Sequence, residues 1–332
     1  MKRFLLGLMA FQLLVTSCEE PKKKASKENM WQYVTTVDQS EPVPRHEAAF
    51  VGVKDKFYLL GGRGIRPVSI YDNATSTWSN GAKPPIEIHH FQPVVHKNLV
   101  YVIGAMTGGY PDETPVPNIY IYNVSNDNWT IGDSIPRDRL RGSTGNVIYN
   151  NKVYISCGIK NGHIGEHKKW LDTYDLKTRK WQILPDAPME RDHFQAAIVG
   201  HKMYLLGGRQ SKAPDETFKH TIAEVCAFDF QEEKWEILPN NLPTMRAGNM
   251  VTPIHEYIWV IGGESDNQSV AHNEVEVLNT KTKIWEKKPA LLRGRHGSGI
   301  VVYKNACYVA SGSGNKGGSP ELKSMEKFVF SK

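Results

Sequence analysis

A short sequence unit recurs six times along this chain of 332 residues, and a period of about fifty residues restricts the fold to architectures built from repeated units. In each copy an aromatic residue is followed, three positions later, by Gly-Gly or a close variant of it. The leading aromatic residues are Tyr58, Tyr101, Tyr154, Tyr204, Trp259 and Tyr308. Each copy closes a short apolar run that is typical of a β-strand.

Two further positions keep fixed distances within the unit. The position thirteen residues before the leading aromatic is Ile88 in the second copy and basic in the others: Arg45, Arg141, Arg191, Arg246 and Arg295. After the glycines comes a pair such as Tyr71-Asp72, and a tryptophan follows seven residues after its first member. These tryptophans are Trp78, Trp129, Trp181, Trp235 and Trp285. Four strands fit into each copy, which predicts an all-β propeller.

This combination of a double glycine, a Tyr-Asp pair and a spaced Trp resembles the kelch-repeat family over roughly residues 30–330. The resemblance implies a six-bladed β-propeller with four antiparallel strands per blade. The sixth copy ends at Phe330 without a following Trp, whereas Trp31 stands before Arg45 as the other tryptophans stand before their own basic positions. We therefore expect the N-terminal strand around Trp31 to complete the last blade, because this pairs edges that would otherwise stay open.

The N-terminal residues have the features of an export signal. Lys2 and Arg3 precede an apolar run from Phe4 to Val15, and the segment ending in Cys18 resembles a bacterial lipoprotein signal with its lipobox. The resemblance implies cleavage before Cys18 and lipidation of that cysteine; an ordinary secretory peptide is the alternative. We expect a signal peptide over residues 1–17, a charged tether over 18–29 and the propeller over 30–332. The propeller would be exported and lipid-anchored, on the periplasmic face of the envelope or at the cell surface.

Charge and cysteine content exclude some classes of function. Without the first 29 residues the net charge is about +3, and no basic run interrupts the repeats, which argues against a nucleic-acid partner. Cys157, Cys226 and Cys307 are an odd number in different repeats, so they do not predict a disulfide framework. We expect them to be small buried residues.

The lengths of the connections predict which face of the propeller carries function. The first and third turns of each copy have constant length, whereas the second turns and interblade connections vary, and these two open on the same face. Nine of the twelve histidines fall there, beside the repeated arginines, and such groups suit an anionic, polyhydroxylated or metal-bound ligand. The candidate ligand-binding residues are Arg45, His46, His89, His90, Arg141, His163, His167, Trp170, Arg191, His193, Arg246, Arg295 and His296.

Structural roles are the alternative for several of these candidates. The repeated arginines begin polar turns that could simply tie one blade to the next. Trp170 lies outside the repeated tryptophan positions, in an extended loop. It either contacts a ligand or packs this loop onto its own blade.

The kelch family also includes copper oxidases of the galactose oxidase type and bacterial sialic acid mutarotases. The oxidase resemblance would require two Tyr, two His and a cross-linked Cys, but the cysteines of this chain lie within expected strands. The His89-His90 pair, together with His46 or His193, is a weak metal motif without a fixed third ligand, so we expect no metal and no cofactor. A mutarotase needs an acid, a base and a cation, for which Arg191, His193, Glu190 and Glu166 are candidate catalytic residues.

The sequence thus predicts an exported, lipid-anchored and monomeric propeller. Its expected partner is a carbohydrate or an envelope protein, bound on the face of the interblade and second-turn loops. Sugar mutarotase or epimerase activity is the alternative function.

Overall fold

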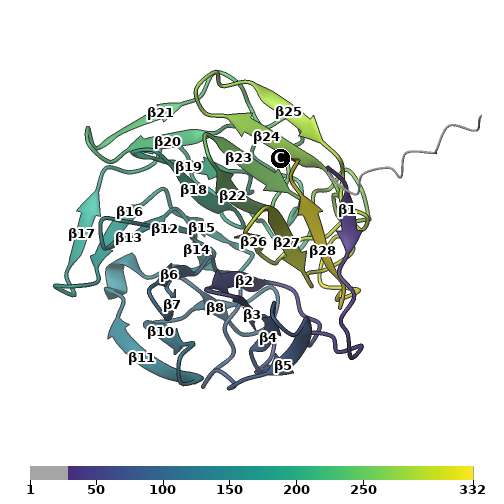
Figure 1. Ribbon diagram of the computed structural model, residues 1–332. Coiled ribbons are helices and arrows are strands. Elements are labelled where there is room, and N and C mark those ends of the chain that lie inside the picture. Colours follow the sequence, from purple (N-terminus) through teal and green to yellow (C-terminus); the bar gives the residue numbers. More distant parts are fainter. Residues whose placement is uncertain (1–28, 332) are drawn as a thin grey trace, which may run out of the picture.

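The computed structural model describes residues 29–331, which form a ring of six four-stranded antiparallel sheets (Figure 1). In the first five blades the strands follow one another from the centre to the rim in chain order. The prediction of a six-bladed propeller is confirmed. The signal peptide, most of the tether and Cys18 lie outside the described residues.

The strand bounds repeat from blade to blade. Blade 1 comprises β2 (Ala48–Val53), β3 (Lys56–Gly61), β4 (Ser69–Asp72) and β5 (Thr77–Asn80). Blade 2 comprises β6 (Val94–His96), β7 (Leu99–Val102), β10 (Asn118–Asn123) and β11 (Asn128–Ser134). Blade 3 comprises β12 (Gly145–Tyr149), β13 (Lys152–Ser156), β16 (Leu171–Asp175) and β17 (Trp181–Leu184), preceded by the short 3-10 helix η1 (Arg137–Arg139). Blade 4 comprises β18 (Gln195–Val199), β19 (Lys202–Leu206), β20 (Cys226–Asp229) and β21 (Lys234–Ile237). Blade 5 comprises β22 (Met250–Ile254), β23 (Tyr257–Ile261), β24 (Val275–Asn279) and β25 (Trp285–Lys288).

Blade 6 joins the two ends of the described chain. Its inner strands are β26 (Ile300–Tyr303), β27 (Ala306–Ala310) and β28 (Met325–Val329), and its outer strand is β1 (Trp31–Tyr33). β1 pairs with β28 in the register Trp31↔Phe328, and the Trp31 indole donates a hydrogen bond to the Pro289 carbonyl at 2.9 Å. The predicted closure by the N-terminal strand is confirmed.

The aromatic-Asp and Trp positions of the repeat have a local physical explanation. In blade 1 the Asp72 carboxylate accepts the backbone N–H of Ala74 at 2.8 Å and so holds the tight third turn. The acidic or amide residue at the same position in the next four copies accepts an equivalent N–H, two residues on, at 2.9 Å. The turn brings Trp78 onto Tyr71, with ring centroids 5.2 Å apart. The motif therefore builds the outer hairpin of the first five blades.

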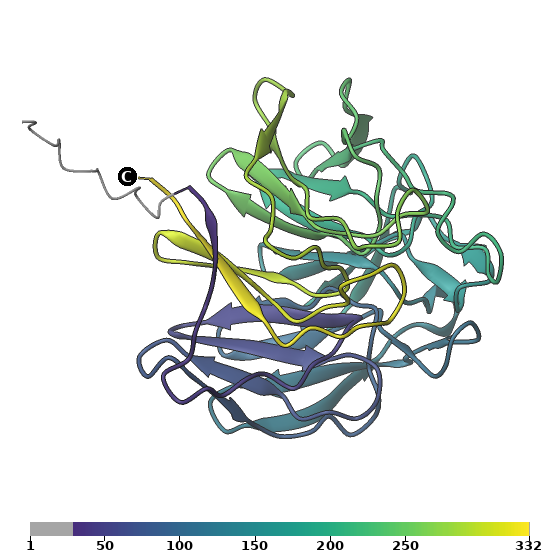
Figure 2. The ribbon, with the colours of Figure 1, turned by 90° about the vertical axis from the view of Figure 1, so that its right-hand side faces the viewer.

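The two faces of the ring differ as the connection lengths predict. The second-turn loops of blades 2 and 3 contain the small hairpins β8 (Met106–Thr107)–β9 (Thr114–Pro115) and β14 (Ile159–Asn161)–β15 (Gly165–His167). The longer loops and the C-terminal end lie on opposite faces (Figure 2), and the Asn29 N–H donates to the Val329 carbonyl near that end. Within residues 29–331, no helix is long and apolar enough to cross a membrane.

Candidate functional site

One repeat position places a residue of every blade around the central channel. It lies two residues after the basic position and is occupied by Glu47, His90, Ser143, His193, Gly248 and Gly297. All six have a left-handed backbone with φ between 51° and 65°, and all line a narrow central cavity of about 40 Å³. This conformation suits glycine and is uncommon for other residues. Four blades nevertheless keep a polar side chain there, and strained backbone of this kind clusters at functional sites.

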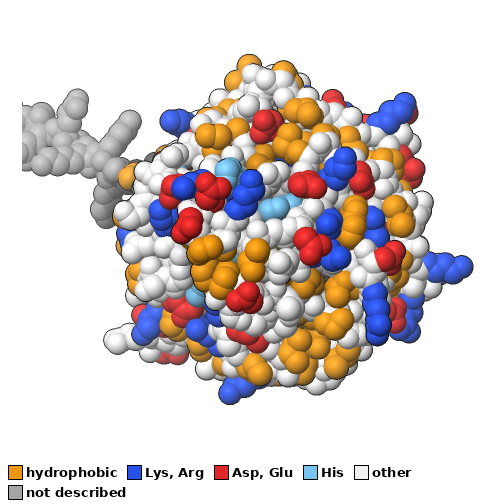
Figure 3. All heavy atoms as spheres, turned by 180° about the vertical axis from the view of Figure 1, so that it is seen from behind, with side chains coloured by type: hydrophobic (Ala, Val, Ile, Leu, Met, Phe, Trp, Pro, Cys, Tyr) orange, Lys and Arg blue, Asp and Glu red, His pale blue; other side chains and the backbone are white. Residues whose placement is uncertain are grey.

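A wider cavity of about 540 Å³ opens where these residues meet the second-turn loops. We call this cavity the funnel. Its lining comprises His46, Glu47, Arg63, His90, Tyr110, His163, Arg209, Thr217, Phe218, Glu264, Gly317 and Gly318. Acidic, basic and histidine side chains gather around the middle of the loop face (Figure 3). The volume lies within the range of small-molecule sites.

Three histidines from three blades meet at the junction of the funnel and the central channel. The ring centroids of His90, His163 and His193 are 4.6 to 5.0 Å apart. All three side chains are buried. Burial lowers the pKa of His90 well below its usual value, and the neighbouring His193 and His89 lower it further. Burial, followed by the charge of Arg209, also lowers the pKa of His193. Burial therefore favours the neutral form of both imidazoles.

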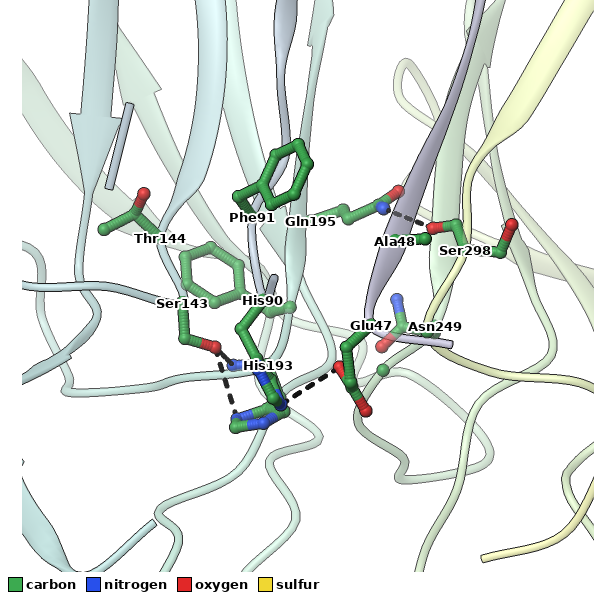
Figure 4. Close-up of a pocket in the computed structure, with 13 residues that line it drawn as sticks. Glu47, Ala48, His90, Phe91, Ser143, Thr144, His193, Gln195, Asn249 and Ser298 are labelled. Atoms are coloured by element: carbon green, nitrogen blue, oxygen red, sulfur yellow. Dashed lines mark hydrogen bonds and ion pairs between the residues drawn. The ribbon is translucent and has the colours of Figure 1, made fainter. Parts of the chain in front are cut away.

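Carboxylates lie directly beside this histidine cluster. Glu47 Oε2 is 3.2 Å from His90 Nε2, and Figure 4 shows Glu47, His90 and His193 converging. Glu264, also buried, accepts a hydrogen bond from Arg209 at 2.5 Å and another from the Gly317 N–H at 2.8 Å. Burial raises the pKa of Glu264, but His296 and Arg209 outweigh it and lower the pKa to about 2. The funnel thus combines neutral imidazoles with ionised carboxylates, the groups needed for proton transfer or cation binding.

The repeated arginines do not line the funnel. All five are buried within the blades, and they donate to main-chain carbonyl oxygens of their own blade. Arg246, for example, donates to Gly262 and Val260 and pairs with Glu276 at 2.6 Å. These contacts support the structural alternative for Arg45, Arg141, Arg191, Arg246 and Arg295.

The other predicted residues divide between the funnel and its surroundings. His46 lines the funnel with its Nδ1 2.8 Å from Glu321 Oε1. Three other histidines lie behind the lining. His89 Nδ1 is 2.5 Å from His90 Nδ1, and His167 Nε2 is 2.9 Å from Asp192 Oδ2. His296 Nε2 is 2.8 Å from the Gly317 carbonyl oxygen. Most predicted histidines therefore do gather around one site.

Trp170 and the candidate catalytic residues are more scattered. Trp170 does not line the funnel. The Arg139 guanidinium carbon lies 4.2 Å from the centroid of the Trp170 ring. This contact supports the alternative in which Trp170 packs its own loop onto the blade. Glu166 has an exposed side chain 3.8 Å from two lysines, and Glu190 is half-buried beside Gln210. Of the four candidates, only His193 reaches the channel.

Several site residues have no repeat signal in the sequence. Glu113 and Asp192 lie behind the histidines, and Phe218 reaches the funnel from the long second-turn loop of blade 4. Glu47 could have been found by aligning the copies, since it shares its repeat position with Gly248 and Gly297. A charged residue where other copies have glycine is a signal for function.

Comparisons with known proteins agree with this architecture. The family model described as Attractin/LZTR1 beta-propeller matches residues 23–251, and the Kelch motif matches residues 245–292. The chain is 26% identical to Kelch-like protein terF of Aspergillus terreus over 90% of the chain and 68% of that protein. It is 25% identical to Kelch-like protein 40 of Xenopus tropicalis over 59% of the chain, which spans only 32% of that relative.

A solved structure, that of YjhT, has the same fold. It superposes with a TM-score of 0.72 at 16% identity and covers 86% of this chain and 95% of its own. The family models, the curated relatives and the six four-stranded blades lead to one conclusion: the chain belongs to the kelch-repeat β-propeller family.

Proposed function

We propose that this propeller binds a small polyhydroxylated ligand, a carbohydrate, in the funnel. The observation that carries the proposal is the funnel itself, which collects charged and hydrogen-bonding groups from the loop face beside two aromatic rings. Tyr110 is half exposed, and its hydroxyl lies 2.9 Å from Thr217 Oγ1. Phe218 is held by the Arg209 guanidinium, 4.9 Å from the ring centroid. An apolar ring face with convergent polar groups suits the mixed surface of a sugar.

Ligand-observed NMR on the full chain with a panel of neutral and acidic sugars tests this proposal. We expect Tyr110→Ala and Phe218→Ala to weaken binding at least about tenfold, as expected for aromatic anchors of a binding site. Trp170→Ala is the matched control, since this aromatic residue lies outside the funnel, and it should bind like the unmodified chain. If binding is lost in Trp170→Ala but kept in the funnel variants, the carbohydrate site lies at Trp170 and not in the funnel. No binding across the panel would favour a protein ligand instead.

Sugar mutarotase activity is a second candidate because the funnel offers carboxylates and imidazoles that could act as acid and base. Glu47 lies beside His90, and Glu264 lies 3.3 Å from His296. Opening a sugar ring requires one group to remove a proton and another to donate one. The test follows anomer exchange of freshly dissolved sialic acid by NMR. Glu47→Gln should slow the exchange at least about a hundredfold, whereas Glu256→Gln, on the opposite face, should not. Exchange at the spontaneous rate with unmodified protein would exclude this activity.

We also propose that the chain is exported and anchored through a lipid on Cys18. The motif at residues 1–18 supports this. The described chain begins on the face opposite the loops, so a tether there would leave the funnel pointing away from the membrane. Cys18→Ser should abolish labelling by a radioactive fatty acid and release the protein from the membrane fraction. Unchanged labelling in Cys18→Ser would contradict the anchor.

A further inference from the structure

We propose that His90, His163 and His193 form a binding site for a divalent first-row transition metal ion such as Zn²⁺. Each of these histidines offers one nitrogen, and the three nitrogens lie within 4.8 Å of one another. The site does not depend on which ligand enters the funnel. The sequence predicts no metal, because the adjacent His89-His90 pair lacks a fixed third ligand. The second-turn loop of blade 3 supplies that ligand as His163.

The hydrogen bonds of the rings fix which nitrogen carries the proton. His163 Nδ1 donates to Glu113 Oε2 at 2.8 Å, and His193 Nδ1 donates to Asp192 Oδ1. In a neutral imidazole whose Nδ1 carries the proton, Nε2 keeps its lone pair. His163 and His193 therefore each present Nε2 as an acceptor or a metal ligand.

His90 reaches the same tautomer through His89. The Gly108 carbonyl can only accept, so His89 Nε2, 3.0 Å away, donates to it. The Nδ1 of a neutral His89 then accepts the proton of His90 Nδ1 at 2.5 Å. This leaves the lone pair of His90 on Nε2 as well. All three buried histidines thus keep their lone pair on Nε2.

Two of these Nε2 atoms lack a hydrogen-bond partner. Among residues 29–331, His90 Nε2 and His193 Nε2 are buried without a hydrogen-bond partner, although buried polar atoms are normally paired. Glu47 Oε2, 3.2 Å from His90 Nε2, is an acceptor when ionised and cannot satisfy it. A cation satisfies the lone pairs and the carboxylate together. Tetrahedral zinc with bonds of about 2.0 to 2.1 Å to nitrogen needs nitrogens about 3.4 Å apart, and the three nitrogens here already lie within 4.8 Å of one another.

The partners behind the histidines are those of a metal site. Metal-binding histidines commonly donate their other N–H to a carboxylate, which orients the ring. Glu113 is itself held by Arg63, and Asp192 accepts the Ser211 N–H at 3.0 Å. His90 and His163 line the funnel, so an open coordination position there is accessible. Three histidines with an open position are a known ligand set for catalytic zinc.

A neighbouring group of Glu47, Glu264 and His296 is less suited to a metal. His296 Nε2 lies 2.9 and 2.8 Å from the carbonyls of Asn315 and Gly317, so this nitrogen carries a proton. The remaining nitrogen of His296, Nδ1, is 3.9 Å from Glu47 Oε1. The triple-histidine cluster is therefore the site to test.

The test is metal binding by the untagged full chain after treatment with a chelator. We expect one equivalent of Zn²⁺ in calorimetric titration, and Co²⁺ should give the visible absorption of a four- or five-coordinate site with nitrogen ligands. His163→Ala should lower the Zn²⁺ affinity at least about a hundredfold, and Asp192→Asn should lower it about ten- to a hundredfold. His272→Ala is the matched control, because His272 is buried and paired with Glu274 outside the cluster.

Circular dichroism and the thermal midpoint show whether each variant is folded before titration. If His163→Ala is not folded, His163→Gln replaces it. A folded chain that binds neither ion at 50-fold excess overturns the proposal, as does a folded His163 variant with unchanged affinity. The titration contains no sugar, so a failure here leaves carbohydrate binding untouched, and a sugar panel without hits leaves the metal site untouched.

Discussion

Replacing Arg246 by methionine tests whether the repeated arginines hold the blades together or serve the ligand. Arg246 and Glu276 have fully buried side chains, and their charged atoms are 2.6 Å apart. The guanidinium also donates to the carbonyls of Thr244, Gly262 and Val260. Methionine fills much of the volume of the arginine stem, so the main effect is electrostatic.

The magnitude follows from the carboxylate that is left behind. Without Arg246, Glu276 keeps only the Thr244 hydroxyl at 2.8 Å and a longer contact to its N–H, so a buried charge loses its counterion. Breaking a buried ion pair on one side costs about 3 to 5 kcal/mol. We expect Arg246→Met to lower the free energy of unfolding by about 4 kcal/mol. Adding Glu276→Gln removes the charge, keeps the Thr244 contacts and should restore at least about half of the loss.

Arg191→Met is the matched control. Among the described residues Arg191 has no carboxylate partner and donates to the carbonyls of Gly207 and Glu224, so the loss should stay near 1 to 3 kcal/mol. Urea unfolding followed by tryptophan fluorescence gives each value. Equal losses for Arg246→Met and Arg191→Met, or a double variant no more stable than Arg246→Met, would refute the reasoning. Loss of ligand binding in a folded Arg246→Met would point to a functional arginine instead.

Three further predictions concern closure, acid stability and the thiols. Trp31→Ala should lower the free energy of unfolding in urea by about 3 to 5 kcal/mol, because Trp31 is 3% exposed and anchors the strand that closes the ring; a loss below about 1 kcal/mol would contradict this. The pKa of Glu264 falls from 4.5 to about 2 on folding, so its contribution, on the order of 3 kcal/mol, is present above pH 4.5 and is lost as the pH falls toward 2. Glu264→Gln should flatten this part of the stability profile, and an unchanged acid limb would refute the assignment. In a Cys18→Ser background a thiol reagent should label the protein only after unfolding, because the remaining three cysteines are buried and burial raises the pKa of Cys157 and Cys307 to about 12; rapid labelling of the native protein would be inconsistent with this packing.

The sequence predicts the fold well because the fold is made of local rules that are repeated. Asp72 holds a turn two residues away, and Trp78 packs on Tyr71 across that same turn, so fixed spacings in the sequence become fixed contacts. Even the closure by Trp31 follows from counting strands. The variable loop face and its histidines could be predicted for the same reason, since connection lengths are visible in the sequence.

The composition of the histidine cluster could not be predicted in this way. His90, His163 and His193 come from three blades, and their meeting depends on the shape of the long second-turn loop that carries His163. The carboxylates behind them come from other connections, Glu113 from the second-turn loop of blade 2 and Asp192 from the segment before β18. His90 and His193 share a repeat position, but no spacing rule connects them to His163, which is placed by the path of its own loop.

Two features repeat from blade to blade in this ring, and one indicates a structural role whereas the other indicates a functional one. A residue such as Arg246, found at the same place in five of six copies, makes contacts that every blade needs, and so it lies inside the scaffold. At the channel position the backbone is left-handed in all six copies, but only two copies, Gly248 and Gly297, have the glycine that this backbone favours. Glu47 and His193 keep a left-handed conformation that costs a non-glycine residue about 1 to 2 kcal/mol. Stability alone would favour glycine in all six blades, so the departure from the repeat marks the part of the ring where chemistry outweighs stability.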